Sequence, residues 1–256
     1  MSGDLQWIFK LIKDKVAIVT GASSGIGYAT VLALSKAGAK VAIGARRTDR
    51  LDKLQNEVTQ NGGEALSQKL DVTKKIDCDS FVDATVKKWG RVDILVNNAG
   101  LMPLSFVKNT KVDEWERMVD VNIKGVLYCT AAVIPHMISQ KSGHIVNISS
   151  VAGRIVFPAG SVYCATKHAV AAFSEGLRQE LSPKHNIRVT SIEPGVVETE
   201  LTNTITDKSL ESFLKYVKEM KSLKAEDVAN AILFAVDSPP HVNVNEVLMR
   251  STQQER

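Results

Sequence analysis

Short runs of apolar, often β-branched residues recur along the chain, and amphipathic stretches lie between them. Short apolar runs bounded by polar residues are typical of buried strands, whereas a periodicity of 3.6 residues is typical of helices. The pattern predicts strands at residues 16–20, 41–45, 65–70, 94–96, 144–149, 187–192 and 244–249. It predicts helices at 28–37, 51–60, 80–89, 115–132, 162–181 and 225–236.

This alternation of strands and helices predicts an α/β fold. Continuous apolar strands joined by helices form a parallel sheet that is covered on both faces. No linker, repeat or low-complexity tract interrupts residues 15–256, so we expect a single doubly wound, Rossmann-type domain. Ligands of such sheets bind at the carboxyl ends of the strands.

Residues 1–14 precede the first predicted strand and form an N-terminal extension. Its apolar residues Leu5, Trp7, Ile8, Phe9, Leu11 and Ile12 are interrupted by charged ones. The run is too short to span a bilayer and lacks a cleavage site of small residues. We expect the extension to pack on the domain or on a neighbouring subunit, and we expect no membrane association.

Composition excludes several classes of function. The net charge of +4 comes from scattered basic residues, which does not predict nucleic-acid binding. The three cysteines have neither disulfide-framework nor zinc-site spacing, and the five histidines are dispersed, so we expect no metal site. Free cysteines favour a reducing compartment, and we expect a cytoplasmic protein.

The first predicted strand runs into a glycine-rich turn, residues 20–27, from which a helix begins. Glycines allow the backbone to approach a pyrophosphate, and the amides of a helix N-terminus favour negative charge. The GxxxGxG spacing is looser than the GxGxxG dinucleotide fingerprint. The candidate cofactor-binding residues here are Gly21, Ser23, Ser24, Gly25, Ile26 and Gly27.

Two arginines, Arg46 and Arg47, follow the second predicted strand. NAD-binding folds place an acid here to hold the ribose 2′-hydroxyl, but no acid follows this strand. Guanidinium groups bind phosphate through charge-assisted hydrogen bonds, so the pair predicts NADP(H) rather than NAD(H). Asp71, beside Val72 after the third strand, could accept a hydrogen bond from the adenine amino group or could cap a helix.

Tyr163 and Lys167 are four residues apart in a predicted helix, so both side chains point to one face. A free tyrosine has a pKa of about 10, whereas an efficient acid/base at neutral pH has one of about 7. An ammonium group about 4 Å away contributes about 4 kcal/mol toward the phenolate, which matches that gap. A YxxxK pair alone is also common on exposed helix surfaces.

Several motifs occur together and in order: TGASSGIG at 20–27, NNAG at 97–100, Asn122, NISS at 147–150, the Tyr163/Lys167 pair, and Pro194 with Gly195. Together they resemble the short-chain dehydrogenase/reductase family, and the resemblance runs from about Lys15 to Met249. It implies an oxidoreductase that transfers hydride between a nicotinamide cofactor and a carbonyl compound.

The resemblance also implies four catalytic residues. Tyr163 is the expected general acid in reduction and base in oxidation. Lys167 is expected to lower the pKa of Tyr163 and to hold the nicotinamide ribose. Ser150 is expected to hydrogen-bond the substrate oxygen, with Ser149 as a rival. Asn122 is expected to position a water that connects Lys167 with solvent.

Further cofactor contacts are implied in the loops after the later strands. The resemblance assigns Asn97, Ala99 and Gly100 to the cofactor, and it gives Asn98 a mainly structural role beside it. Pro194 and Gly195 are expected to turn the chain under the nicotinamide. Val197 and Thr199 are available to bind its carboxamide.

A segment rich in Thr, Ser and Lys, residues 198–222, precedes the last predicted helix. In this fold its position predicts a lid over the substrate, although a surface excursion is the alternative. Mostly apolar walls favour an uncharged carbonyl substrate, whereas Arg154 or lid lysines could receive a carboxylate. The expected walls are Met102, Pro103, Val156, Phe157 and Pro158, with Leu201, Ile205, Leu210, Phe213, Leu214 and Tyr216 from the lid.

The C-terminal run 241–246 resembles a subgroup that includes NADP-dependent 3-hydroxy acid and serine 3-dehydrogenases and the reductase of clavulanate aldehyde. The family commonly forms dimers or tetramers through the two long helices, and the apolar residues of 162–181 agree with burial on more than one side. Two alternatives remain. A catalytically silent NADP(H)-binding regulator or scaffold would not need the Ser/Tyr/Lys/Asn set, and an extended epimerase or dehydratase would need a larger C-terminal domain.

Overall fold

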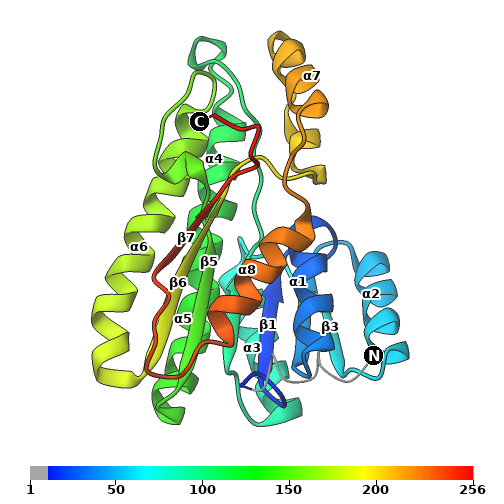
Figure 1. Ribbon diagram of the computed structural model, residues 1–256, viewed down its shortest axis with the longest axis vertical. Helices are drawn as coiled ribbons and strands as arrows, with labels where there is room; N and C mark the ends of the chain where they lie inside the picture. The colour runs from blue at the N-terminus through cyan, green and yellow to red at the C-terminus, as the bar shows by residue number, and fades with distance from the viewer. Residues whose placement is uncertain (1–10, 256) are drawn as a thin grey trace.

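Seven parallel strands form one sheet between two layers of helices (Figure 1). The computed structural model describes residues 11–255. The strand order is β3-β2-β1-β4-β5-β6-β7, as expected for a doubly wound sheet. The strands are β1 Val16–Thr20, β2 Lys40–Ala45, β3 Ala65–Lys69, β4 Ile94–Asn97, β5 Gly143–Ile148, β6 Ile187–Pro194 and β7 Glu246–Met249.

Two apolar clusters, one on each face of the sheet, hold the helical layers in place. One cluster contains Val31 of α1, Leu54 of α2 and Ile232 of α8. The other contains Phe81 of α3, Val133 of α5 and Leu177 of α6. The helices are α1 Gly25–Lys36, α2 Thr48–Gln60, α3 Lys75–Trp89, α4 Val112–Val119, α5 Gly125–Gln140, α6 Ser161–His185, α7 Glu211–Glu219 and α8 Ala225–Val236.

The predicted helix at 115–132 is wrong in its bounds and in its regularity. Helix α4 starts at Val112, a π-helical turn Asp120–Lys124 follows, and α5 continues to Gln140. The whole run, Val112–Gln140, is long and apolar enough to cross a membrane by length and composition alone. Its residues Cys129, Val133 and Met137 are buried in the core, as in the core helix of a globular domain.

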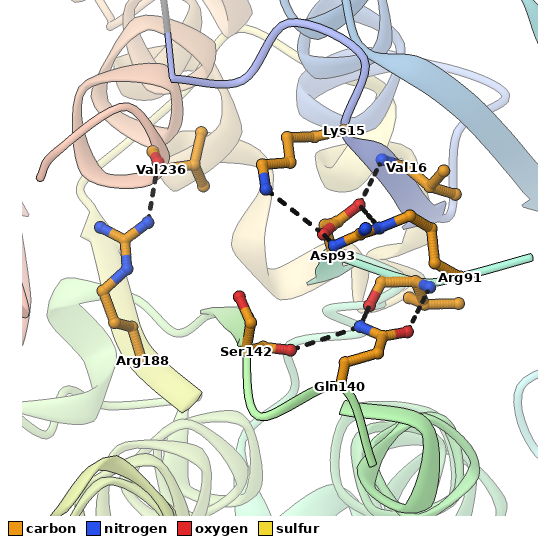
Figure 2. A network of polar contacts seen from close by, with 9 residues as sticks. Lys15, Val16, Arg91, Asp93, Gln140, Ser142, Arg188 and Val236 are labelled. Carbon is orange, nitrogen blue, oxygen red and sulfur yellow. Dashed lines mark hydrogen bonds and ion pairs between the residues drawn. The ribbon is translucent and has the colours of Figure 1, made fainter. Parts of the chain in front are cut away.

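Polar contacts fix the amino ends of the central strands (Figure 2). The Asp93 carboxylate is 5% exposed and accepts hydrogen bonds from the Val16 amide at 2.9 Å and from Arg91 Nε at 2.9 Å. Gln140 Nε2 donates to the Val92 carbonyl at 2.8 Å, which ties the end of α5 to the same edge. The start of β1, the approach to β4 and the end of α5 are thereby joined.

The described end of the N-terminal extension packs on the domain. Ile12 is 1% exposed and belongs to the cluster of α1, α2 and α8. The Leu11 amide donates to Asp237 Oδ1 at 3.0 Å, and the Asp14 amide donates to the Gly38 carbonyl at 2.9 Å. The predicted apolar residues Leu5, Trp7, Ile8 and Phe9 lie outside the described residues.

The sheet order reverses between β1 and β4, because β2 and β3 lie on one side of β1 while β4 to β7 lie on the other. This switch point opens a crevice at the carboxyl ends of the strands, the usual ligand site of such sheets. Helix α7 projects beyond this end of the sheet, at the top of Figure 1. The fold therefore brings the loops after β1, β4, β5 and β6 to one place.

Candidate active site

A cavity of about 1520 Å³ lies at the carboxyl ends of the strands. It exceeds the usual size of a small-molecule pocket, roughly 300–1,000 Å³, and so has room for a dinucleotide and a second ligand. Most of the predicted site residues line it. They are Gly21, Ser23, Ser24, Gly25, Ile26, Arg46, Arg47, Asp71, Val72, Asn98, Ala99, Gly100, Ser150, Tyr163, Lys167, Pro194, Gly195, Val197 and Thr199.

The glycine-rich turn has the shape that a phosphate-binding turn requires. Gly21 and Gly25 have φ of 66° and 57°, which L side chains rarely adopt. A Cβ on Gly27 would lie 2.4 Å from Asn98 Nδ2, so Gly27 permits close packing and does not itself line the cavity. No acidic residue occupies the first turn of α1, and Ser24 makes no side-chain cap hydrogen bond. The α1 amides are therefore suited to an anionic group such as a pyrophosphate.

Thr20 and Asn98 hold this turn against the loop after β4. Thr20 Oγ1 accepts hydrogen bonds from the amides of Asn98 and Ala99, both at 3.0 Å. Asn98 Nδ2 donates to the Thr20 carbonyl at 2.8 Å. Asn98 thus has the mainly structural role expected of it.

The prediction that Asn97 contacts the cofactor is wrong. Asn97 is 3% exposed, and its Nδ2 donates to Asn147 Oδ1 at 2.8 Å and to Thr130 Oγ1 at 3.1 Å. Because successive side chains of a strand alternate between faces, Asn97 points into the core beneath α5 while Asn98 follows at the crevice. The NNAG motif alone does not distinguish these directions.

Arg46 and Arg47 lie at the mouth of the cavity but differ in their contacts. Arg47 Nη2 donates to Ser24 Oγ at 2.7 Å, and its Nη1 donates to Glu200 Oε2 at 2.8 Å. Arg50 Nη1 donates to the other oxygen of Glu200 at 2.7 Å. The sequence showed no carboxylate opposing the arginines; the structure corrects this, because Glu200 arrives from the lid.

Asp71 lines the cavity, and the alternative that it caps a helix is wrong, because α3 begins at Lys75 with Lys74 at its N-cap. Asp71 Oδ1 accepts from the Thr73 amide at 3.1 Å and from Thr73 Oγ1 at 2.8 Å. Burial acts to raise the pKa of Asp71, but these hydrogen bonds, with Arg46 and Lys74 nearby, hold the pKa below its ordinary value. Asp71 is therefore an anion at neutral pH.

Tyr163 and Lys167 share one face of α6, as their spacing predicts, and both are buried. Lys167 Nζ lies 5.7 Å from the centroid of the Tyr163 ring and donates to the Ile148 carbonyl at 2.8 Å. Ser150 lies after β5 and lines the same cavity. Ser149 also lines the cavity, and its Oγ donates to the Lys167 carbonyl at 3.0 Å. Ser150 Oγ donates to the Pro194 carbonyl at 3.3 Å and accepts from the Ala152 amide at 3.1 Å.

Burial is the largest influence on the pKa values of Tyr163 and Lys167. It raises the pKa of Tyr163 to about 12, although the hydrogen bond with Ser150 opposes this. Burial also lowers the pKa of Lys167 to about 8. The expectation that Lys167 brings the pKa of Tyr163 toward neutrality is therefore not met in this structure, where burial is the largest influence on that pKa.

Asn122 does not contact Lys167 through its side chain and does not line the cavity. Its Oδ1 accepts from the Leu101 amide, and its Nδ2 donates to the Leu101 carbonyl, both at 2.9 Å. Nδ2 also lies 3.2 Å from Thr166 Oγ1. Asn122 thus joins the π-helical turn to the loop after β4 and to α6, and its side chain is a positioning group.

The substrate end of the cavity is mainly apolar, as predicted. Of the predicted walls, Met102, Val156, Phe157, Pro158, Leu201, Leu210, Phe213 and Tyr216 line it, whereas Pro103, Ile205 and Leu214 do not. The prediction that Arg154 could receive a substrate carboxylate is wrong. Arg154 Nε donates to the fully buried Glu193 at 2.7 Å, and Arg154 also pairs with Glu246.

The segment 198–222, which the sequence predicts as a lid, is held by side-chain contacts that the sequence did not indicate. Asp207 Oδ2 accepts from Ser105 Oγ at 2.8 Å and from Asn109 Nδ2 at 2.7 Å. Met102 N donates to Thr204 Oγ1 at 3.1 Å. At the other end, Gln254 Oε1 accepts from the Val196 amide at 2.8 Å, so the C-terminal tail supports the loop after β6.

Comparisons with known proteins agree with this geometry. The sequence profile described as "short chain dehydrogenase" matches residues 15–210. An uncharacterized oxidoreductase of Staphylococcus saprophyticus is 49% identical over 245 residues, covering 95% of this chain and 98% of the relative.

Two solved structures illustrate the range of cofactors among similar folds. The closed form of a serine dehydrogenase complexed with NADP+ has a TM-score of 0.87 and 36% identity, covering 94% of this chain and 96% of that one. A short chain dehydrogenase/reductase from Burkholderia phymatum in complex with NAD has a TM-score of 0.84 and 26% identity, covering 93% and 90%. The profile match and the full-length relative show that the chain is an oxidoreductase of the short-chain dehydrogenase family.

Proposed function

We propose that the protein is an NADP(H)-dependent oxidoreductase that interconverts a secondary alcohol and a ketone or aldehyde. One observation carries the proposal: the glycine-rich turn, the two arginines and the Ser150, Tyr163 and Lys167 side chains line a single cavity. The serine dehydrogenase with bound NADP+ supports the choice of cofactor, and the arginines after β2 support it from this chain's own residues.

Each part of the cavity has a role in this proposal. The turn and the α1 amides would hold the pyrophosphate, and Arg46 and Arg47 would hold the 2′-phosphate. The bound cofactor would supply or accept the hydride. Ser150 would hold the substrate oxygen, and Lys167 would hold the nicotinamide ribose.

Tyr163 would exchange the proton with the substrate oxygen. With a pKa of about 12, its phenol is protonated at neutral pH and is ready to donate in the direction of reduction. The same pKa makes the phenolate, which oxidation of an alcohol needs, scarce at neutral pH.

The substrate that fits best is an uncharged, largely apolar ketone or aldehyde. Phe157, Leu210 and Phe213 give the far end of the cavity an apolar wall. Arg154, the arginine expected to receive a substrate carboxylate, does not line the cavity and is engaged by Glu193 and Glu246. We accordingly place apolar carbonyl compounds ahead of 3-hydroxy acids and their 3-oxo products.

We further propose a homo-oligomer, a dimer or tetramer, assembled through the α4–α5 run and α6. Val119 and Leu127 support this, because they are 37% and 38% exposed on a helical run whose other side is buried. A cytoplasmic location accords with the three free cysteines, all of them buried.

The experiment that tests the proposed function has two parts. Fluorescence titration of the purified protein should give a Kd for NADPH below that for NADH. A panel of apolar ketones and aldehydes, each paired with a 3-oxo acid of similar size, should then show NADPH oxidation mainly with the uncharged member. Equal Kd values would contradict the cofactor assignment, and a uniform preference for the acids would contradict the substrate class.

A further inference from the structure

Glu200 forms ion pairs with Arg47 and Arg50, and Arg47 is one of the two arginines that we propose for the 2′-phosphate. Its two carboxylate oxygens accept hydrogen bonds from Arg47 at 2.8 Å and from Arg50 at 2.7 Å. All three residues line the cavity beside Arg46. Glu200 thus makes the kind of charge-assisted contacts that a phosphate oxygen would make with the same guanidinium groups.

The contact joins two parts of the chain that are far apart in sequence. Arg47 follows β2 and also bonds Ser23 and Ser24 of the glycine-rich turn. Glu200 begins a short 3₁₀ helix, Glu200–Thr204, whose Thr204 Oγ1 accepts from the Met102 amide. One carboxylate therefore connects the cofactor end with the base of the lid.

The two ion pairs are weak enough to be displaced. The side chains of Arg47, Arg50 and Glu200 are 42%, 40% and 45% exposed, and exposed pairs are held loosely because water screens them. Hydrogen bonds from Arg50 and Arg47 lower the pKa of Glu200 to about 2, so it carries its charge at neutral pH. Arg46 makes no side-chain hydrogen bond or ion pair within residues 11–255.

We infer that Glu200 is a specificity-determining residue that competes with the cofactor 2′-phosphate for Arg47 and Arg50. Arg46 is available at once, whereas Arg47 becomes available only when Glu200 withdraws. The inference rests on the proposed binding of NADP(H) in this cavity. It means that Glu200 weakens NADPH binding selectively, since NADH carries no phosphate to compete for the arginines.

Glu200→Gln tests this, because it removes the charge and keeps the shape of the side chain. Glu198→Gln is the matched control: Glu198 is exposed, two residues away, and does not line the cavity. Kd values of NADPH and NADH are measured by fluorescence titration for the parent and both variants, without substrate. Thermal unfolding of each variant checks that the fold is retained.

The expected result is a Kd for NADPH about tenfold lower in Glu200→Gln, equivalent to about 1.4 kcal/mol, with the Kd for NADH changed less than twofold. Glu198→Gln should leave both values at the parent level. An NADPH to NADH ratio that stays within twofold of the parent would overturn the inference, as would an equal effect of Glu198→Gln. A parent protein that binds neither cofactor would overturn the proposed function as well, whereas the unchanged ratio overturns only the role of Glu200.

Discussion

The proposed cofactor end and the proposed lid of the same cavity are built in different ways. The cofactor end is fixed by buried backbone and side-chain contacts, such as the Thr20 hydroxyl, which is 1% exposed and accepts from two amides. The segment 198–222, which we propose as the lid, is fixed mainly by side-chain hydrogen bonds that converge on Asp207, and within it only Asp207 and Leu210 are buried. Helix α7 in the lid has no fully buried residue.

This difference indicates which part of the site can move. Segments with few buried apolar contacts and exposed polar ones open at low free energy, whereas buried segments open only with the whole domain. A rigid cofactor end suits a ligand whose phosphates need fixed amides. A less firmly held lid suits a substrate that must enter and leave between turnovers.

The largest expected effect follows from Thr20→Val at the cofactor end. The change leaves the amides of Asn98 and Ala99 without their acceptor in a buried site, where each unsatisfied group costs about 1–3 kcal/mol. We expect the free energy of unfolding to fall by roughly 2–4 kcal/mol in chemical denaturation. NADPH affinity should fall with it, because the glycine-rich turn loses its anchor.

Thr30→Val is the control for this change. Thr30 is equally buried, but its hydroxyl donates to the Ile26 carbonyl within its own helix, so no amide depends on it. A loss of stability in Thr20→Val no larger than in Thr30→Val would contradict the rigid cofactor end.

The second-largest effect is expected at the buried pair Tyr163 and Lys167, which lies between the proposed cofactor end and the proposed lid. Reduction requires Tyr163 and Lys167 both protonated, and Lys167, with a pKa of about 8, loses its proton long before Tyr163. The kcat/KM for reduction should be level below about pH 7 and fall about tenfold per pH unit above pH 9.

Lys167→Arg sharpens this test, since a guanidinium group stays charged beyond pH 12. The variant should be less active, but its pH profile should lack the descending limb near pH 8. The same limb in both proteins would show that another group controls it.

The smallest expected effect is that of Asp207→Ala in the lid. Loss of the bonds from Ser105 and Asn109 should raise the KM for the carbonyl substrate several-fold, with NADPH affinity nearly unchanged. Hydrogen exchange should become faster in residues 198–222 and not in residues 20–27. Asp79→Ala, which removes only a surface pair with Lys75, should change none of these quantities.

Much of the architecture could be predicted from local pattern. The apolar runs gave the seven strands to within two residues at each end, because the central strands are buried on both faces and only the edge strands β3 and β7 are partly exposed. The prediction of one regular helix at 115–132 missed the π-helical turn at Asp120–Lys124, because this turn keeps the helical pattern while changing the bond spacing. This turn carries Asn122, whose side chain joins it to Leu101 of the cavity wall and to Thr166 of α6.

The sequence predicted those site residues that lie within one local motif. It did not predict contacts between side chains that are far apart in the sequence. The spacing of Tyr163 and Lys167 gave their common face. No local signal showed that Glu200 reaches Arg47, that Glu193 and Glu246 engage Arg154, or that Asp207 holds the lid, because these pairs are far apart in sequence or depend on the register of β6 with β7. The predicted pKa of Tyr163 differed from that in the structure for a related reason. Burial raises this pKa, and burial depends on the whole fold rather than on neighbouring residues in the sequence.

Tyr163→Phe tests the central claim most directly. Kinetics of NADPH oxidation with an apolar ketone substrate should show kcat lowered by roughly 10²–10⁴-fold, because the ring keeps its packing and loses only the proton donor. The Kd for NADPH should stay within twofold of the parent, and Tyr128→Phe, on α5 outside the cavity, should be fully active. A Tyr163→Phe protein that reduces the ketone at nearly the parent rate would contradict the account.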